Sequence, residues 1–433
     1  MTSIVRCSLA RRVGAASRIT TTAALSSSRT LLVAAPSRSL ATIDTTKSAA
    51  SASSQQPIAS SSPLPTPTPP LPPSSAEQHA VGQVRTDWTK AEVQSIFDSP
   101  LLELLFHAAR VHRMHHDPRK VQQCTLLSIK TGGCSEDCSY CPQSSRYSTG
   151  VKAQKLLKED VVLEAARKAR DAGSSRFCMG AAWRDLHGRK TNFNTILNYV
   201  SEIRGMGMEV CCTLGMLTPT QAAQLKAAGL TAYNHNLDTS REHYPKVITT
   251  RSYDDRLETI AAVRDAGISV CSGGIIGLGE SVTDRVSLLH TLATLPSHPE
   301  SVPVNALLAV PGTPLEASAP VDVWEMVRMI STARIIMPTA MIRLSAGRVK
   351  FSVPEQALCF MAGANSIFTG DKLLTTPNNT FSEDQQMFET LGLTPKDANF
   401  KQGRQVDEMA FLGEDLDKPA PPVTKKGEFV IEG

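Results

Sequence analysis

Residues 161–181 read VVLEAARKARDAGSSRFCMGA, and this stretch contains one full unit of the predicted fold. Its first half repeats apolar residues at helical spacing and stops at Gly173, a residue type that commonly follows the end of a helix. Its last six residues form a β-rich run. The same order of helix, glycine and strand recurs at Gly229 and Gly267. Alternating helices and strands predict an α/β protein with a parallel sheet.

The same unit repeats through most of the chain. Eight β-rich runs are expected at Thr125–Lys130, Arg176–Ala181, Glu209–Leu214, Ala232–Leu237, Ser269–Ile276, Val302–Val310, Met341–Ser345 and Ser366–Phe368. Helical patterns lie between them at Val161–Ala172, Phe193–Arg204, Pro219–Ala228, Tyr253–Ala266, Val282–Leu292, Val321–Ile336 and Pro354–Ala364. Eight strands alternating with helices over roughly 250 residues have the size and order of a (β/α)8 barrel of the TIM type, although a doubly wound sheet shows the same alternation.

This pattern also sets the expected limits of the domain. The barrel domain is predicted at residues 87–412, with its core at about 119–345. It begins with a helical segment at residues 89–117.

Charge is distributed unevenly along the 433 residues. The formal net charge is +4, but residues 1–75 carry six Arg and one Lys against a single acid, Asp44. The remaining residues carry 38 basic and 40 acidic side chains, so the body has no positive excess for a nucleic acid to bind. No apolar run reaches 18 residues, which argues against a membrane span. We therefore expect neither a nucleic-acid partner nor a membrane.

The N-terminal segment has the composition of a targeting sequence. Residues 1–43 contain many Ser, Thr and Ala and no acid, together with Arg6, Arg11, Arg12, Arg18, Arg29 and Arg38. This composition is typical of a mitochondrial transit peptide and predicts a matrix location. Residues 44–86, rich in Ser and Pro, are expected to form a disordered linker, and residues 413–433 a flexible tail.

The sharpest local motif is Cys134-Ser-Glu-Asp-Cys138-Ser-Tyr-Cys141, which follows the first predicted strand. In a barrel, the loops after the strands form the face that carries the active site. Three thiolates can hold three corners of a 4Fe–4S cluster and leave the fourth iron open. A zinc site or a ferredoxin-type electron carrier remains an alternative, and each would need a fourth ligand.

Three more cysteines, Cys178, Cys211 and Cys271, fall inside the second, third and fifth predicted strands. A single buried Cys is usually a small packing residue, but the inward faces of barrel strands converge, which favours a shared site. Because side chains alternate along a strand, Cys211 is expected to face the interior and Cys212 the helices. The other cysteines of the body are predicted packing residues: Cys124, Cys212 and Cys359.

Two further strands carry polar side chains toward the expected interior. On the fourth, Asn234, Asn236 and Asp238 share one face, where they would bind a ligand or close a turn. Arg343 on the seventh would also point inward, and a buried Arg most often pairs with a carboxylate. The run Gly273–Glu280 lacks the spacing of a dinucleotide-binding loop, so its glycines indicate either a close-lying ligand or a tight turn.

From about residue 88 to residue 393 the chain resembles the biotin synthases, a family of radical S-adenosylmethionine (SAM) enzymes. Long strings carry the resemblance: LLSIKTGGC, CSYCPQSSRY, RFCMGAAW, YNHNLDTS, CSGGIIGLGE, RLSAGR and CFMAGANSIF. The resemblance implies a (β/α)8 barrel of the radical SAM class that forms a homodimer.

The resemblance also implies roles for single residues, which fall into four groups. The ligands of a 4Fe–4S cluster would be Cys134, Cys138 and Cys141. The ligands of a 2Fe–2S cluster would be Cys178, Cys211, Cys271 and Arg343. SAM would be bound by Asn236, Asp238, Gly273, Ile275, Gly277 and Glu280. The substrate would be bound by Asn236, Asn305, Thr375 and Thr376.

The activity implied by the resemblance is the last step of biotin biosynthesis. The reduced 4Fe–4S cluster would cleave SAM, the resulting radical would take hydrogen from dethiobiotin, and the 2Fe–2S cluster would supply sulfur. Such an enzyme is a sulfurtransferase. Its implied partners are dethiobiotin, SAM, a ferredoxin-type electron donor and iron–sulfur assembly proteins.

Two other functions remain open on the sequence alone. A different radical enzyme with the same barrel, such as a hydrogenase-maturation or lipoyl-type enzyme, would share the cysteine motif. The lipoyl type needs an additional N-terminal cysteine motif, and residues 76–123 contain no Cys. A cluster-binding electron carrier or scaffold would hold iron without converting a substrate.

Overall fold

The computed structural model describes residues 72–400. The predicted transit peptide and C-terminal tail lie outside these residues, as do residues 44–71 of the predicted linker and 401–412 of the predicted barrel domain. Among the described residues, no helix combines the length and the apolar character that crossing a membrane requires.

Eight parallel strands close into a barrel, with the fifth strand in two pieces. The strands are β1 (Lys120–Lys130), β2 (Arg176–Ala181), β3 (Glu209–Thr213), β4 (Ala232–Asn234), β5 (Ser269–Cys271) with β6 (Gly274–Ile276), β7 (Ser301–Ala306), β8 (Met341–Leu344) and β9 (Ser366–Thr369). Each strand pairs with the next, and β1 pairs with β9, which closes the ring. This confirms the barrel and excludes the doubly wound sheet, whose edge strands stay unpaired. The short β10 (Thr394–Pro395) adds to β1 outside the ring.

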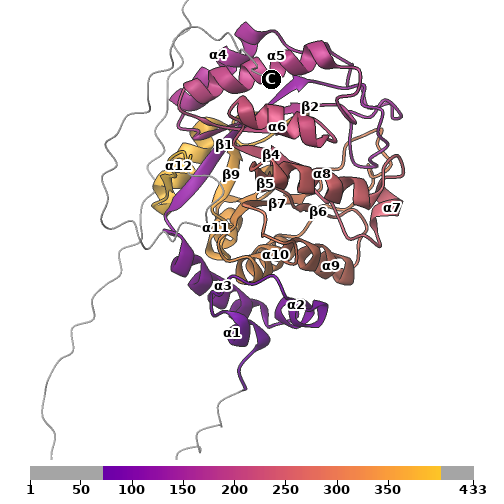
Figure 1. Ribbon diagram of the computed structural model, residues 1–433. Coiled ribbons are helices and arrows are strands. Elements are labelled where there is room, and N and C mark those ends of the chain that lie inside the picture. The colour runs from indigo at the N-terminus through magenta and orange to yellow at the C-terminus, as the bar shows by residue number, and fades with distance from the viewer. Residues whose placement is uncertain (1–71, 401–433) are drawn as a thin grey trace, which may run out of the picture. The chain divides into compact units, whose positions relative to one another are not determined.

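Helices surround the barrel (Figure 1). They are α4 (Glu159–Asp171), α5 (Lys190–Gly205), α6 (Pro219–Ala227), α7 (Tyr244–Val247), α8 (Tyr253–Asp265), α9 (Val282–Ala293), α10 (Val323–Ile336), α11 (Val353–Met361) and α12 (Phe381–Leu391), with a short 3-10 helix at Arg348–Lys350. Three more, α1 (Ser75–His79), α2 (Lys90–Phe97) and α3 (Leu101–His115), precede the barrel and pack against one another and against α9 and α10.

Local sequence explains where many of these helices begin and end. Thr218, Ser252 and Ser281 each accept a hydrogen bond from the third helical residue in a capping box, which starts α6, α8 and α9. The predicted stops after α4 and α6 are present, because Gly173 and Gly229 follow these helices with φ of 93° and 94°.

The fifth strand differs from the single run that was predicted at Ser269–Ile276. It breaks at Ser272 and Gly273, opposite Pro303 of β7. Proline has no backbone N–H to donate to the ladder, and a Cβ added at Gly273 would lie 2.0 Å from the Pro303 carbonyl oxygen. The chain therefore needs glycine here, and the strand resumes as β6.

The helical segment predicted at residues 89–117 is two helices. Helix α2 ends at Phe97 and α3 begins at Leu101, with Pro100 at the N-cap of α3. Proline disfavours helical backbone in the residue before it, which separates the two helices.

The prediction of a disordered linker up to residue 86 was wrong for its last part. Helix α1 lies within that range, and Ser74 caps it by accepting a hydrogen bond from Glu77 N. Ala76 and Ala80 are buried, and the Arg85 guanidinium lies 3.6 Å from the centre of the Trp88 ring. Small apolar side chains at helical spacing gave this segment a buried face despite its polar composition.

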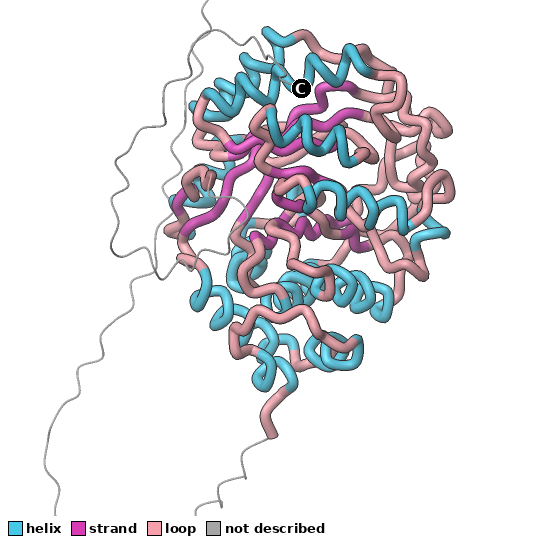
Figure 2. The backbone as a smooth tube through the Cα atoms, in the orientation of Figure 1, coloured by secondary structure: helices cyan, strands magenta, loops and turns pink. Residues whose placement is uncertain are grey.

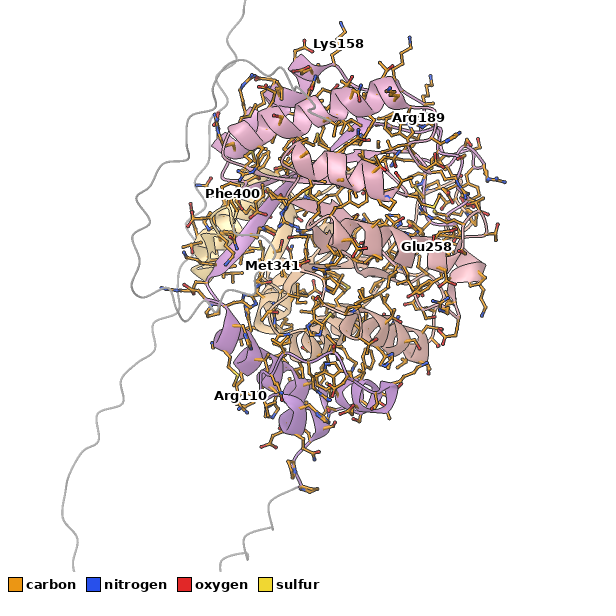
Figure 3. The ribbon with its side chains drawn as sticks, in the orientation of Figure 1. Arg110, Lys158, Arg189, Glu258, Met341 and Phe400 are labelled. Atoms are coloured by element: carbon orange, nitrogen blue, oxygen red, sulfur yellow. The ribbon has the colours of Figure 1, made fainter. Side chains whose placement is uncertain are left out.

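Two packing clusters position the site. The main core lies between the strands and the surrounding helices, and a smaller cluster of Cys124, Cys178, Cys211 and Ala232 lies inside the barrel. Figure 2 shows that long loops gather on the side of the barrel where α7 lies. Figure 3 shows Met341, the first residue of β8, near the centre, and Lys158 and Arg189 near the periphery.

Candidate active site

The loop after β1 folds back on itself and carries the three-cysteine motif. Cys134 N donates to the Gln143 carbonyl at 2.9 Å, and Ser145 N donates to the Cys134 carbonyl at 2.8 Å. Cys141 N donates to the Cys138 carbonyl at 2.9 Å, which forms a tight turn between these two residues. All three thiols are free, with Cys138 buried and the other two half-buried. The loop therefore holds three thiols in one short, hydrogen-bonded turn.

The two acids between the cysteines anchor this loop to its neighbours. Glu136 forms ion pairs with Arg184 at 3.3 Å and with Arg251 at 3.8 Å. Asp137 accepts a hydrogen bond from Thr249 N at 3.0 Å. Although burial raises the pKa of Asp137, its hydrogen bonds from the Thr249 side chain and backbone outweigh burial and lower the pKa to about 2. These contacts tie the motif to the segments that follow β2 and β4.

The chemistry of the three thiols fits an iron–sulfur cluster. Burial raises the pKa of Cys138 to about 12 and that of Cys141 to about 11, so without a cation both stay protonated. A cationic cluster would replace these protons. In the described residues, no three His, Cys, Asp or Glu side chains converge on one metal ion, whereas thiolates around a cluster each bind a different iron.

The interior cysteines come together inside the barrel. Cys178 and Cys211 are paired in register on β2 and β3, and Cys271 is paired with Asn234 of β4. A hydrogen bond from Cys211 lowers the pKa of Cys271 well below its usual value, although burial opposes this shift. Cys212 belongs to the main core on the other face of β3, as strand alternation predicted.

Arg343 also points into the barrel, but its partners differ from the expected carboxylate. Its guanidinium donates to Ser366 Oγ at 2.9 Å and approaches Cys271 Sγ at 3.6 Å. Its Nη2 lies 3.4 Å from Cys124 Sγ and 3.5 Å from Gln122 Oε1. None of the ion pairs in residues 72–400 involves this side chain, so its hydrogen-bonding partners are sulfur and neutral oxygen, and the centre of the Phe368 ring lies 4.8 Å from its guanidinium carbon.

A buried ion pair lies next to this group. Arg176 of β2 pairs with Glu209 of β3 at 2.5 Å, and Gln122 Nε2 donates to the same carboxylate at 3.3 Å. Asn399 N donates to Glu209 Oε1 at 2.7 Å. Because these residues lie at the amino ends of β2 and β3, they form the polar floor of the barrel.

Asp238 lies beyond the end of β4, beside β6. Its carboxylate pairs with Arg256 and accepts a hydrogen bond from Tyr140 Oη at 2.9 Å. Both contacts are made to Oδ2. The side chain is buried, and Tyr140 belongs to the three-cysteine motif. The cysteine loop is thereby joined to the fourth strand.

Asn236 joins the same strand to the interior cysteines. Its Oδ1 accepts from Asn234 Nδ2 at 3.1 Å and from Gly273 N at 3.3 Å. The same Asn234 nitrogen lies 3.3 Å from Cys271 Sγ. The polar side chains predicted on the fourth strand therefore do meet, but β4 ends at Asn234 and the other two lie beyond it.

The glycine run after β5 is explained by contacts within the protein. A Cβ at Gly277 would lie 2.8 Å from Val321 Cγ2, and φ there is 98°. Glu280 accepts from Gly277 N at 3.0 Å and from Arg285 Nε at 2.8 Å, which closes the turn into α9. Ile275 N donates to the Asp238 carbonyl at 2.8 Å, so β6 lies directly against the segment that carries Asp238.

The four proposed substrate contacts lie in different surroundings. The Asn305 amide donates to the Gly274 carbonyl at 2.8 Å and accepts from Ala346 N at 3.2 Å, so it bridges neighbouring segments. Thr375 and Thr376 are half-buried in the loop after β9. Leu374 of this loop reaches β2, since a Cβ at Gly180 would lie 2.4 Å from its Cδ2.

Similar proteins share the sequence that builds this site. The mitochondrial biotin synthase of Arabidopsis thaliana is 75% identical over 318 residues, which cover 73% of this chain and 84% of that protein. The biotin synthase of Cytophaga hutchinsonii is 64% identical over 321 residues, which cover 74% and 95%. This chain belongs to the biotin synthase family.

Further comparisons agree with this membership. The mitochondrial biotin synthase of Emericella nidulans is 55% identical over 361 residues, 82% of this chain and 91% of that protein. The Radical SAM superfamily profile matches residues 128–292, and the Biotin and Thiamin Synthesis associated domain matches residues 303–394. This biotin synthase family member is thus a radical SAM enzyme, a class that uses a 4Fe–4S cluster and SAM.

Solved structures show the same fold in more distant proteins. Methylornithine synthase (PylB) has a TM-score of 0.63 at 19% identity, with 75% of this chain and 97% of that chain covered. The hydrogenase maturase HydG has a TM-score of 0.65 at 16% identity, with 75% of each chain covered. At these identities the likeness concerns the barrel alone.

Sequence reasoning missed an arginine in the family member's site. Arg256 on α8 pairs with Asp238 and donates to the Asn236 carbonyl. Its Nε donates to the Tyr244 hydroxyl at 2.7 Å. A helix that covers the barrel can thus supply a cation to the strand end, and no strand periodicity signals it.

Two further residues near the cysteines were also missed. Tyr140 is the aromatic residue before the last cysteine of the motif, but its contact with Asp238 was not predicted. Cys124 was predicted to be a packing residue, but the structure places it with the interior cysteines. Nothing in the local pattern of β1 distinguishes this cysteine from a packing residue.

A cavity of about 370 Å³ opens beside the carboxyl ends of β1 and β2. Lys130, Lys155 and Arg189 line it together with Trp183.

Proposed function

We propose that the chain is a biotin synthase, a sulfurtransferase that inserts sulfur into dethiobiotin in the last step of biotin biosynthesis. One observation carries the proposal: the two cysteine sets are linked through one polar segment, residues 234–238, at the end of β4. Tyr140 of the cysteine loop donates to Asp238 at 2.9 Å, and Asn234 contacts both Asn236 and Cys271. A ligand at Asn236 and Asp238 would thereby lie next to both sets.

The two cysteine sets divide the cofactors between them. Cys134, Cys138 and Cys141 would hold the 4Fe–4S cluster, and Cys178, Cys211, Cys271 and Arg343 would hold the 2Fe–2S cluster. When bound, the first cluster supplies the electron that cleaves SAM, and the second supplies the sulfur. The protein contributes position and exclusion of water, because hydrogen abstraction from an unactivated carbon lies beyond its acids and bases.

The remaining site residues would bind the two small molecules. The SAM contacts are assigned to Asn236, Asp238, Gly273, Ile275, Gly277 and Glu280. The substrate contacts are assigned to Asn236, Asn305, Thr375 and Thr376. Buried Asp238 would accept hydrogen bonds from the ribose hydroxyls, and the ion pair with Arg256 would hold its carboxylate in place.

We further propose the setting in which the enzyme works. It would act in the mitochondrial matrix as a homodimer. A ferredoxin-type protein would supply electrons, and iron–sulfur assembly proteins would supply the clusters. The names of the mitochondrial relatives and the composition of residues 1–43 support the location.

Anaerobic reconstitution tests the proposal. With iron, sulfide, a reductant, SAM and dethiobiotin, the expected products are 5′-deoxyadenosine and biotin. Deoxyadenosine without biotin would contradict the substrate and leave a different radical enzyme. An absence of both products would contradict catalysis and favour a cluster-binding scaffold.

A further inference from the structure

Cys124 lies in the wall of the site proposed for the second cluster. It is fully buried on β1, in the interior group with Cys178 and Cys211. Its Sγ lies 3.4 Å from Arg343 Nη2. Four cysteines and Arg343 therefore lie together inside the barrel, where the proposed 2Fe–2S cluster needs four donors.

The surroundings of Cys124 differ from those of a packing cysteine. Its thiol lies 3.6 Å from Gln122 Oε1 and 3.9 Å from Ser366 Oγ, in addition to the Arg343 contact. Cys359, by comparison, is equally buried but belongs to the main apolar core. Cys124 thus lies among polar side chains, whereas Cys359 lies among apolar ones.

The guanidinium of Arg343 lies between Cys271 and Cys124. The two terminal nitrogens of the guanidinium lie 3.6 Å from Cys271 Sγ and 3.4 Å from Cys124 Sγ, so the guanidinium separates these two sulfurs. A guanidinium has no free lone pair while it is protonated, whereas a thiolate is a regular iron ligand. The weak donor Arg343 thus has a stronger donor, Cys124, directly beside it.

We propose that Cys124 is a second donor for the coordination position assigned to Arg343, so that either side chain can complete the ligands of the second cluster. This inference rests on the proposed 2Fe–2S cluster. With Arg343 as ligand, Cys124 lies next to the cluster. With Cys124 as ligand, Arg343 donates hydrogen bonds to the sulfurs and balances their charge.

The test compares four variants after anaerobic reconstitution: C124S, R343M, the double variant C124S/R343M, and the matched control R343M/C359S. Mössbauer spectra of ⁵⁷Fe-loaded protein count each cluster type per chain without reference to activity. Both single variants and the control should keep the 2Fe–2S cluster. The double variant should hold at least about tenfold less of it, because two donors are gone from one position.

Three outcomes would overturn the inference. The first is R343M losing the 2Fe–2S cluster while it keeps the 4Fe–4S cluster, which would make Arg343 indispensable. The second is the double variant keeping the 2Fe–2S cluster, which would make both side chains dispensable. The third is C124S alone losing the cluster, which would leave Arg343 unable to serve.

Two controls separate these outcomes from other failures. The 4Fe–4S content and far-UV circular dichroism report folding, and if R343M does not fold, R343K replaces it in the same comparison. A wild-type chain that assembles only the 4Fe–4S cluster would contradict both the second cluster of the proposed function and this inference. A wild-type chain that assembles both clusters confines any failure to Cys124.

Discussion

Asp238 has a strained backbone conformation that positions its side chain in the site. It is the one non-glycine residue with positive φ, 67°, in the described part of the chain. This conformation lets Asp238 N donate to the Gly273 carbonyl at 3.1 Å while its own carbonyl accepts from Ile275 N at 2.8 Å. Strain of this kind costs about 1–3 kcal/mol and persists where the surrounding structure enforces it. Here the strain places a buried carboxylate beside the cysteine loop.

The hydroxyl of Tyr140 is expected to position this carboxylate. Replacing Tyr140 with Phe removes one hydrogen bond to Asp238 and should raise the KM for SAM about five- to tenfold, the equivalent of one such bond. Tyr147→Phe is the matched control, since Tyr147 donates to the Asp137 carbonyl in the same loop. Equal effects of the two variants would show that only loop stability had changed.

The neighbours Cys211 and Cys212 provide a second test at this scale. Cys211→Ala should abolish the 2Fe–2S absorption, because Cys211 faces the interior group. Cys212→Ala should retain it, because Cys212 packs in the main core. Absorption spectra and iron content after reconstitution measure both. The reverse result would mean that the wrong face of β3 had been assigned to the cluster.

At the scale of elements, the break in the fifth strand has a steric cause. Gly273→Ala should destabilise the fold by more than about 3 kcal/mol, because its Cβ would overlap the Pro303 carbonyl. Urea unfolding followed by circular dichroism would measure the loss. Gly205→Ala at the end of α5 is the control, since a Cβ there has no neighbour within 4 Å. A Gly273→Ala protein as stable as wild type would remove this explanation of the break.

The elements also show which parts of the structure could be read from sequence. Alternation along each strand was enough to separate Cys211 from Cys212 and to turn Arg343 inward. It could not bring Cys124 next to Arg343, because that contact depends on β1 pairing with β9 and β9 pairing with β8. The break opposite Pro303 likewise depends on a partner strand. Contacts that require strand register or barrel closure are absent from local patterns.

The contribution of helix α8 to the site could not be predicted from sequence for a related reason. Arg256 follows the helical pattern of α8, where a charged residue normally faces solvent. It instead reaches the end of β4 and pairs with Asp238. Only the packed barrel shows that this helix face turns toward the site.

For the whole molecule, buried histidines predict an acid limit to stability. Burial, with a smaller contribution from Arg334, lowers the pKa of His112 from 6.5 to about 3. The unfolded chain therefore binds a proton that the folded chain does not, between about pH 6.5 and 3. Stability is full above pH 6.5 and should fall as the pH decreases, by up to about 1.4 kcal/mol per pH unit for this histidine.

His112→Gln should flatten this dependence. Melting temperatures of wild type and variant between pH 7 and pH 4 would show a smaller decrease for the variant. His187→Gln, at an exposed position, is the control and should follow wild type. Parallel curves for wild type and H112Q would mean that other groups dominate the acid response.

The polar floor of the barrel affects how the proposed 2Fe–2S cluster could be rebuilt. Buried and hydrogen-bonded at the amino end of the barrel are Arg176, Glu209 and Gln122. Small molecules are therefore expected to reach the cysteines from the carboxyl end of the strands. If the proposed 2Fe–2S cluster supplies the sulfur, it would have to be rebuilt through the same opening that admits the substrate. Saturating dethiobiotin should therefore slow the return of the 2Fe–2S absorption after turnover, and an unchanged rate would point to a second entrance.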